Sequence, residues 1–177
     1  MVVTMKNIKI IWIVILVLYV SACVEPSYDY LHFDLNPSVD TVELNTPYLD
    51  PGATASYGLK TLTVSVISNT VDTSQVGVYE IVYQTTYETL TQTLKRIVTV
   101  VDETPPVILL QPGIDTITVG SQWIDAGILV TDQSGLPVDI DVIGEVGDLP
   151  GVYVITYQAT DAYGNQSSMD RVIYVIE

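Results

Sequence analysis

The sequence predicts an all-β chain of two tandem β-sandwich domains that follow an N-terminal signal helix and a short tether. Three observations lead to this prediction. Val, Ile, Thr and Tyr dominate the runs after residue 23, and Gly, Pro, Asp and Asn punctuate them, as is typical of short strands joined by turns. Apolar and polar residues alternate in several runs, which is the period of a half-buried strand. Most of the chain also repeats itself once, at an offset of about 75 residues.

The first 22 residues have the three parts of a secretory signal. Lys6 and Lys9 give a basic start, residues 10–20 form an unbroken apolar run, and Ser21 and Ala22 are small residues before a cut. The run is 11 residues long, whereas a membrane-spanning helix needs about 20. A retained anchor helix is therefore the weaker interpretation, and residues 1–22 are predicted to be a cleaved signal.

Cys23 is the only cysteine, so the chain has no disulfide framework of its own. Val20-Ser21-Ala22-Cys23 resembles the bacterial lipobox, in which an aliphatic residue and two small residues precede a cysteine. The resemblance implies a diacylglyceryl group on the thiol of Cys23, a cut before Cys23 and, often, acylation of the new amine. Two or more acyl chains hold a protein stably on a membrane. The alternative is an ordinary cleaved signal followed by an incidental cysteine.

Residues 23–32 are predicted to be the lipidated cysteine and a tether, because this stretch is polar, contains Pro26 and shows no periodicity. Loss of Lys6 and Lys9 with the signal leaves four basic residues against 21 acidic ones, a formal net charge of −17. Such a surface repels phosphate backbones and anionic membranes, which argues against nucleic-acid partners and against membrane binding through basic residues. Acidic charge also keeps an exported protein soluble, and that interpretation stands beside a specific cation-binding role.

The internal repeat covers almost all of the chain after the tether. Four blocks align at offsets of 75, 75, 74 and 75 residues, so a single one-residue gap explains all of them. A unit of this length is a whole domain rather than one turn of a solenoid. The aligned blocks are 40–44 with 115–119, 48–52 with 123–127, 77–83 with 151–157, and 96–100 with 171–175. The predicted domains are residues 33–101 and residues 102–177.

The last third of each repeat gives the clearest strands. Tyr153, Ile155, Tyr157 and Ala159 are expected on one face of a strand, with Val154, Thr156 and Gln158 on the other. Tyr79, Ile81 and Tyr83 are the equivalent face in the first repeat. Residues 161–165 are predicted to be a hairpin connection before a final strand, 171–176, whereas the hairpin at 86–89 has a different sequence.

Several motifs of the second repeat resemble bacterial Ig-like domains, which are often repeated on surface proteins. They include the pesticidal-crystal-protein Ig-like type and the hyalin-repeat-like module. The resemblance covers nearly all of residues 104–177 and is weaker over 33–101. It implies Ig-like sandwiches with a structural or adhesive role and no catalytic residues. The motifs are Pro105-Pro106-Val107-Ile108, Val119-Gly120, Asp125-Ala126-Gly127, Pro150-Gly151-Val152-Tyr153, Tyr157-Gln158-Ala159-Thr160-Asp161 and Gly164-Asn165.

Tyr79 and Tyr153 each follow Gly-Val at the start of a predicted strand. In Ig-like sandwiches a tyrosine in such a place can donate its hydroxyl to upstream backbone and form a tyrosine corner. The alternative is ligand contact by exposed aromatic rings. The structural role is preferred, because the position repeats and lies on the apolar face of the strand.

Candidate chemistry is sparse. A hydrolase usually needs a histidine base, and the only histidine, His32, lies at the edge of the tether without a repeat partner. One histidine and a lipidated cysteine cannot build a zinc site, and phosphate-binding and dinucleotide-binding motifs are missing from the sequence. No catalytic, cofactor-binding or metal-binding residue is therefore predicted, and Cys23 is the one predicted modification site.

Calcium is the one ligand that the sequence leaves open. Asp102 and Glu103 lie between the repeats, where cadherin-like proteins bind calcium, but the dense acidic pattern of those linkers is missing and two prolines could stiffen the joint instead. A second set of polar residues in the second repeat is equally well explained by turn chemistry. This set comprises Asp132, Asp161, Asn165 and Asp170.

The sequence thus predicts a lipid-anchored protein that faces the outside of the cell membrane, on the cell surface or in the periplasm. Its expected function is a non-catalytic binding, adhesion or spacer module with an unknown protein or glycan ligand. The alternative is an accessory domain or weak hydrolase of the cell envelope that uses acidic clusters.

Overall fold

The computed structural model describes residues 25–177, so the predicted signal and Cys23 lie outside the described residues. The fold begins earlier than the sequence predicts. Tyr28–Tyr30 form the 3₁₀ helix η1, and strand β1 runs over Leu31–Leu35 with Leu31 buried. The predicted tether, residues 23–32, therefore overlaps the fold at its end. No helix within the described range has the length and apolar character that a membrane crossing requires.

The first sandwich packs a three-stranded sheet against a four-stranded sheet. Besides β1, its strands are β2 (Thr41–Glu43), β3 (Ala53–Tyr57), β4 (Lys60–Leu62), β5 (Val64–Asn69), β6 (Gly77–Tyr87) and β7 (Leu90–Val101). The small sheet has the order β1-β3-β4 and the large one β2-β7-β6-β5. All pairs are antiparallel except β2 with β7, which run parallel.

The second sandwich repeats this plan. Its strands are β8 (Val107–Leu110), β9 (Thr116–Thr118), β10 (Ile128–Thr131), β11 (Asp139–Ile143), β12 (Gly151–Thr160) and β13 (Gln166–Ile176). The order β11-β12-β13-β9 matches that of the larger first sheet, with β9 again parallel to its neighbour. Strands β8 and β10 form the smaller sheet. Among the described residues, no strand of one sandwich pairs with a strand of the other. The exact domain boundary, between residues 101 and 102, stays a prediction.

Both cores are built from alternate residues of the long central strands. Ile155, Tyr157 and Ala159 of β12 are buried, as the predicted alternation requires. Tyr153 begins the same face and packs partly buried against this core. In the first sandwich, Ile81 and Tyr83 of β6 play the equivalent part. They pack with three buried residues of β1, β3 and β7, namely Phe33, Ala55 and Val98.

The two hairpins differ, as the sequence predicted. Residues 161–165 connect β12 to β13, and Asp161 Oδ1 accepts hydrogen bonds from the backbone N–H groups of Tyr163 and Asn165. The first-sandwich hairpin instead has only Glu88 and Thr89 between β6 and β7. Glu88 has a φ of 51°, in the left-handed region that side chains other than glycine rarely adopt. The final strand, β13, begins five residues before the predicted start at Arg171.

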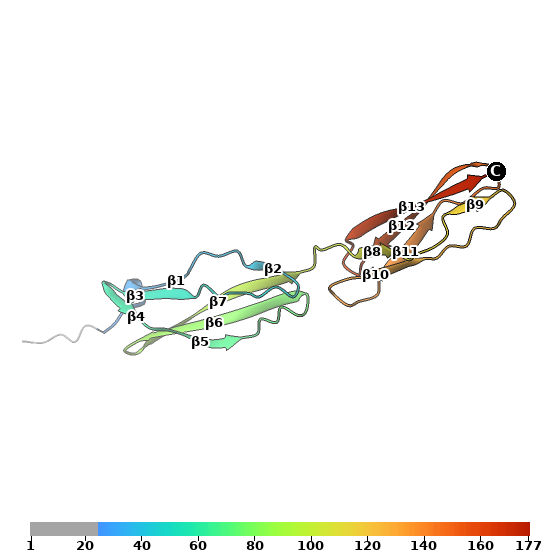
Figure 1. Cartoon of the computed structure of the whole chain (residues 1–177). Coiled ribbons are helices and arrows are strands. Elements are labelled where there is room, and N and C mark those ends of the chain that lie inside the picture. Colours follow the sequence, from blue (N-terminus) through green and yellow to red (C-terminus); the bar gives the residue numbers. More distant parts are fainter. Residues whose placement is uncertain (1–24) are drawn as a thin grey trace, which may run out of the picture.

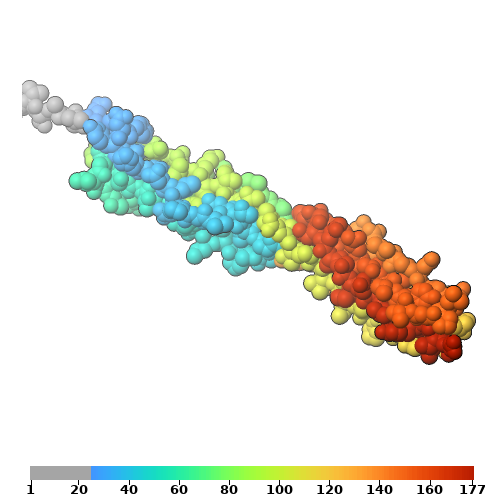
Figure 2. Space-filling view, turned by 90° about the horizontal axis from the view of Figure 1, so that it is seen from above, coloured from blue at the N-terminus to red at the C-terminus, as the bar shows by residue number. Residues whose placement is uncertain are grey.

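The sandwiches lie end to end, so the chain forms an elongated rod (Figures 1 and 2). Helix η1 and the β3–β4 turn lie at one end of the rod. The C-terminus lies at the opposite end, beside β9 (Figure 1). Residues 102–106 connect β7 to β8 at the middle of the rod. We call the end with η1 the near end, the region around residues 102–106 the junction, and the end with the C-terminus the far end.

Candidate functional site

His32 is placed on an open strand surface rather than in a cleft. It is exposed on β1, opposite Ser56 of β3, and Asp34 lies two residues further along the same face. These three residues line a shared surface depression. Within the part of the chain that the structure describes, no hydrogen bond joins His32 to a serine or a carboxylate. The arrangement therefore lacks the base–nucleophile contact that a hydrolase needs.

Tyr79 and Tyr153 form the predicted corners. The hydroxyl of Tyr79 donates to the carbonyl of Gln75 over 2.7 Å, and that of Tyr153 donates to the carbonyl of Leu149 over 2.8 Å. Each bond reaches four residues back along the chain. Gly147 lies so close to Tyr153 that a Cβ there would come within 2.8 Å of the hydroxyl. Both rings are half-buried, so the corners are structural features of the sandwich.

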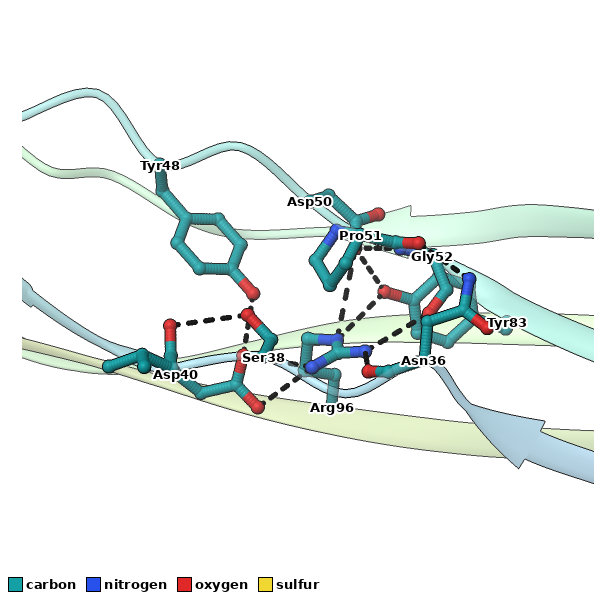
Figure 3. A network of polar contacts seen from close by, with 10 residues as sticks. Asn36, Ser38, Asp40, Tyr48, Asp50, Pro51, Gly52, Tyr83 and Arg96 are labelled. Carbon is teal, nitrogen blue, oxygen red and sulfur yellow. Dashed lines mark hydrogen bonds and ion pairs between the residues drawn. The ribbon is translucent and has the colours of Figure 1, made fainter.

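A buried arginine holds together the first sandwich. Arg96 is only 1% exposed, because the alternation of β7 places it on the inner face with Val98 and Val100. Its Nη1 donates to both oxygens of Asp40, over 2.9 and 2.8 Å, and its Nη2 donates to two backbone carbonyls (Figure 3). Those carbonyls belong to Asn36 and Gly52, in the segments before β2 and β3.

Tyr83 completes this network. Its hydroxyl donates to Asp50 and accepts from Arg96 Nε over 3.3 Å (Figure 3). Burial and the hydrogen bond to Asp50 raise the pKa of Tyr83 to about 12. For Asp40, desolvation is outweighed by hydrogen bonds from Tyr48 and Arg96, which lower the pKa of its carboxyl. The network thus binds the segments around β2 and β3 to the central strands.

The second sandwich contains the equivalent network with fewer contacts. Arg171 donates to Asp115 over 3.1 and 3.4 Å and to the carbonyls of Gln111 and Gly127. Tyr157 donates to Asp125, and burial with this bond raises the pKa of Tyr157 to about 12. Arg171 Nε, in contrast to that of Arg96, is buried and finds no acceptor among the described residues. Sequence reasoning aligned these residues but did not predict that they meet.

Three carboxylates from three separate loops meet at the junction. Asp102 follows β7, Asp132 follows β10 and Asp161 follows β12, and one oxygen of each lies within 4.8 Å of the other two. Asp102 and Asp161 are each 6% exposed, and Asp132 is half-buried. At this spacing two ionised carboxylates repel each other by roughly 3–4 kcal/mol at an effective dielectric constant of about 20. We call Asp102, Asp132 and Asp161 the junction cluster.

Only some of the carboxylate oxygens of the junction cluster accept hydrogen bonds. Asp102 Oδ1 accepts from the backbone N–H of Thr104 and from Gln133 Nε2, and Asp132 Oδ1 accepts from Ser134. The other oxygens, Asp102 Oδ2 and Asp132 Oδ2, are buried and accept no hydrogen bond from the described residues. At Asp161, desolvation is outweighed by hydrogen bonds from Asn165 and nearby backbone, which lower the pKa of the carboxyl.

The first sandwich reaches the cluster through Glu43, at the end of β2. Glu43 accepts hydrogen bonds from Gln133 Nε2, from Thr104 Oγ1 over 2.8 Å and from the backbone N–H of Glu103. Asn45 donates its side-chain amide to the carbonyl of Gln133 over 3.0 Å. Gln133 therefore contacts both sandwiches, and neither Glu43 nor Gln133 was identified from the sequence.

The two calcium sites that the sequence left open coincide at the junction. Asp132 and Asp161 belong to the pole of the second sandwich that faces the linker, so they meet Asp102 there. Asn165 also belongs, since its amide donates to Asp161 Oδ2 and to the carbonyl of Asp102. Asp170 does not, because it lies within β13 and accepts from Thr156. The expectation that the chain holds no metal stays a prediction.

Residues 37–100 and 114–175 match a family model described as the Ig-like domain of bacterial surface proteins, and together they make up more than half of the chain. The chain belongs to this family. The Ig-like match agrees with the two sandwiches and places the chain among bacterial surface proteins. The pesticidal-crystal-protein and hyalin-repeat-like types remain predictions. A search of curated proteins finds no match.

Solved structures resemble the Ig-like chain only distantly. A lipoprotein of Bacteroides thetaiotaomicron, BT2262, is 12% identical, with 81% of this chain and 80% of that chain covered and a TM-score of 0.34. Protocadherin gammaB7 is 20% identical, with 78% and 46% covered and a TM-score of 0.36. Drosophila N-cadherin is 14% identical, with 82% and 50% covered and a TM-score of 0.36. The chain spans about half the length of these two cadherin structures.

Proposed function

We propose that this protein is a lipid-anchored, non-catalytic spacer and adhesion module of the bacterial cell envelope. The observation that carries the proposal is the end-to-end arrangement of two sandwiches, with η1 at one end and the C-terminus at the other (Figure 1). An anchor on Cys23 would hold the first sandwich near the membrane and display the second one farther out. The family match to bacterial surface domains supports this arrangement.

The near end of the rod has side chains that suit a membrane interface. Tyr28 and Tyr30 are more than half exposed, and Leu59, at the β3–β4 turn, is fully exposed. This turn is held beside η1 by a hydrogen bond from Gly58 N to the carbonyl of Tyr30. Tyrosine rings are enriched at membrane–water interfaces, where one end of the ring is apolar and the other is wet. These residues would lie close to the lipid if Cys23 carries the anchor.

The second sandwich, which an anchor on Cys23 would display farther from the membrane, offers a surface for a ligand. Ile114, Ile124 and Leu149 are each more than 70% exposed. Ile114 and Ile124 line a surface pocket with Ile117 and Ala126. Loops at the ends of β-sandwiches carry binding specificity, because they vary while the scaffold stays rigid. We assign the protein or glycan contact to the surface around Ile114 and Ile124.

Charge supports the exclusion of nucleic-acid partners. Only four basic side chains occur in the described residues, and each has a partner: Arg96 and Arg171 in the two networks, Lys95 with Glu80, and Lys60 over the ring of Tyr87. No basic patch is left among them to follow a phosphate backbone. The hydrolase alternative has no comparable support, because His32 lies on β1, toward the near end, whereas the acidic cluster lies at the junction.

The anchor is tested by Cys23→Ser in the natural host. We expect the variant to lose its acyl group and to appear in the soluble fraction or to remain uncut. The native chain should partition with membranes and show the added mass of an acylated Cys23 by mass spectrometry. A Cys23→Ser protein that is cut and still partitions with membranes would refute lipid anchoring through this thiol.

Binding at this surface is tested by Ile124→Asp against a near-end control, Leu59→Asp. Both changes put one carboxylate in place of one exposed apolar side chain. Purified variants are compared with the native chain in pull-downs from cell-wall glycans and surface proteins. We expect Ile124→Asp to lose a ligand that Leu59→Asp retains. Equal capture by both variants would place the ligand contact elsewhere.

A further inference from the structure

We propose that the junction cluster is a calcium site that fastens the linker after the first sandwich to the facing pole of the second. The proposal rests on the side chains of Asp102, Asp132 and Asp161 and is independent of how the protein is anchored. Calcium prefers carboxylate and carbonyl oxygens at about 2.3–2.6 Å. Oxygens that lie within 4.8 Å of one another can therefore all contact one ion placed between them.

Turn geometry explains only half of the cluster. The hydrogen bonds that form the local turns end on the Oδ1 atoms of Asp102 and Asp132. The Oδ2 atoms of the same two residues are buried, and neither accepts a hydrogen bond from the described residues. Asp102 as a whole is 94% buried. A buried carboxylate oxygen without a partner is costly, and a bound cation is one of the few partners that satisfies it.

Charge compensation points the same way. Three carboxylates converge here, and Glu43, which accepts from Thr104 and Gln133, adds a fourth at the rim. No lysine or arginine in the described part of the chain pairs with any of them, since all four basic side chains have partners elsewhere. Buried carboxylates in proteins are paired with a cation or bind a metal. Because no basic side chain of residues 25–177 pairs with the junction carboxylates, metal binding is the remaining way to compensate their charge.

The amide side chains around the cluster hold it in shape. Gln133 donates to Asp102 and Glu43, and Asn165 donates to Asp161 and to the carbonyl of Asp102. These bonds fix carboxylates that arrive from three loops at positions 102, 132 and 161. Calcium tolerates the irregular geometry that results better than magnesium, which demands a near-ideal octahedron. The structure therefore favours calcium over magnesium.

The test is calcium binding to the full chain, purified in detergent and treated with a chelator. Isothermal titration calorimetry with calcium chloride is expected to show one saturable site with a Kd of order 10⁻⁴–10⁻³ M, as in extracellular calcium modules. Magnesium chloride, and sodium chloride at equal ionic strength, serve as controls for simple screening. We expect at least a tenfold weaker affinity for magnesium than for calcium, and no saturable binding of sodium.

Asp102→Asn and Asp132→Asn keep an oxygen that accepts the turn hydrogen bonds and remove the charge. Each should weaken calcium binding at least tenfold. Asp141→Asn on β11 removes the same charge from an exposed position and should leave the Kd unchanged. Binding that survives in folded Asp102→Asn and Asp132→Asn would overturn the assignment, as would a native chain without saturable calcium binding up to about 10 mM.

A second measurement covers variants that fail to fold. In NMR spectra of the native chain, calcium should shift the backbone amides of Thr104, Ser134 and Tyr163, which donate to the three carboxylates. Hydrogen exchange at Thr104 should slow, because the linker becomes fastened. Amides of the near end, such as that of Leu90, should not move. Shifts spread evenly over the acidic surface would show screening alone and would refute the site.

Discussion

Replacing Arg96 by methionine should strongly destabilise the first sandwich. Arg96→Met keeps a long side chain inside but removes donors to Asp40, Asn36 and Gly52 and the contact with Tyr83. Loss of one partner of a buried ion pair typically costs about 3–5 kcal/mol, because the remaining groups stay buried without a counterpart. Asp40 is 31% exposed and regains some hydration, so the lower half of this range is expected.

The neighbouring residue supplies the control. Lys95→Met removes the same charge one position earlier on β7, but its ion pair with Glu80 is exposed, with side chains 61% and 40% accessible. Such pairs contribute about 0–1 kcal/mol. Arg171→Met provides the internal comparison, and it should cost about 1 kcal/mol less than Arg96→Met, since Arg171 Nε has no acceptor among the described residues.

The assay is denaturant unfolding of the full chain, followed by residue-specific NMR so that the two sandwiches are read separately. In Arg96→Met the first sandwich should unfold at lower denaturant while the second keeps its midpoint. Arg96→Lys retains the charge but not the planar fork, and it should recover less than half of the loss. If Arg96→Met and Lys95→Met unfold within about 1 kcal/mol of each other, the network does not stabilise the sandwich as argued.

Three further predictions concern the tyrosines and the second sandwich. Tyr153→Phe should cost about 0.5–1.5 kcal/mol through the lost bond to Leu149, and Tyr153→Ala about 2–3 kcal/mol because the ring is only partly buried. An unchanged urea midpoint for Tyr153→Ala would contradict this. Tyr83 and Tyr157 have folded pKa values of about 12, above the ordinary value of 10, so their contribution is complete below pH 10 and is lost as the pH rises towards 12. The loss should be about 2–3 kcal/mol for each tyrosine, and absorbance at alkaline pH should show both ionising only as the sandwiches unfold. Residues 102–177 should fold alone, because they include a complete strand set and the bonds of Asp102 to Gln133 and Asn165. Random-coil NMR dispersion of that fragment would refute independence.

The repeat and the strand periodicity predicted most of the fold. Tyr153, Ile155, Tyr157 and Ala159 lie on one inward face, as the alternation of apolar residues indicated. The corner bonds of Tyr79 and Tyr153 were also predictable, because they depend on a local four-residue reach. The start of the fold was missed, although Leu31–Leu35 alternates apolar and polar residues. The preceding helix η1 has no such period, and this segment is held by contacts with distant Tyr57.

The buried arginines show why hydropathy misleads at particular positions. A charged residue is normally expected at the surface, so Arg96 and Arg171 were aligned but not placed in the core. Their position on the strand decides the matter, because the period of two puts Arg96 on the face of Val98 and Val100. A signal was present in the sequence. The only two arginines of the chain occur at equivalent positions of the repeat, together with the aspartates and tyrosines that receive them.

The junction cluster, in contrast, could not be predicted from the local sequence. Each of its aspartates is explained locally by a turn, so the sequence gives no reason to join Asp102 to the set that contains Asp132 and Asp161. Only the packing of the linker against one pole of the second sandwich brings them together and leaves two buried oxygens without a partner. The scarcity of basic residues matters at this place, because the four within residues 25–177 have partners elsewhere, inside the sandwiches and along their strands. The acidic composition that keeps an exported protein soluble also leaves the middle of the rod without a protein cation, and there a calcium ion from the medium can stabilise the joint.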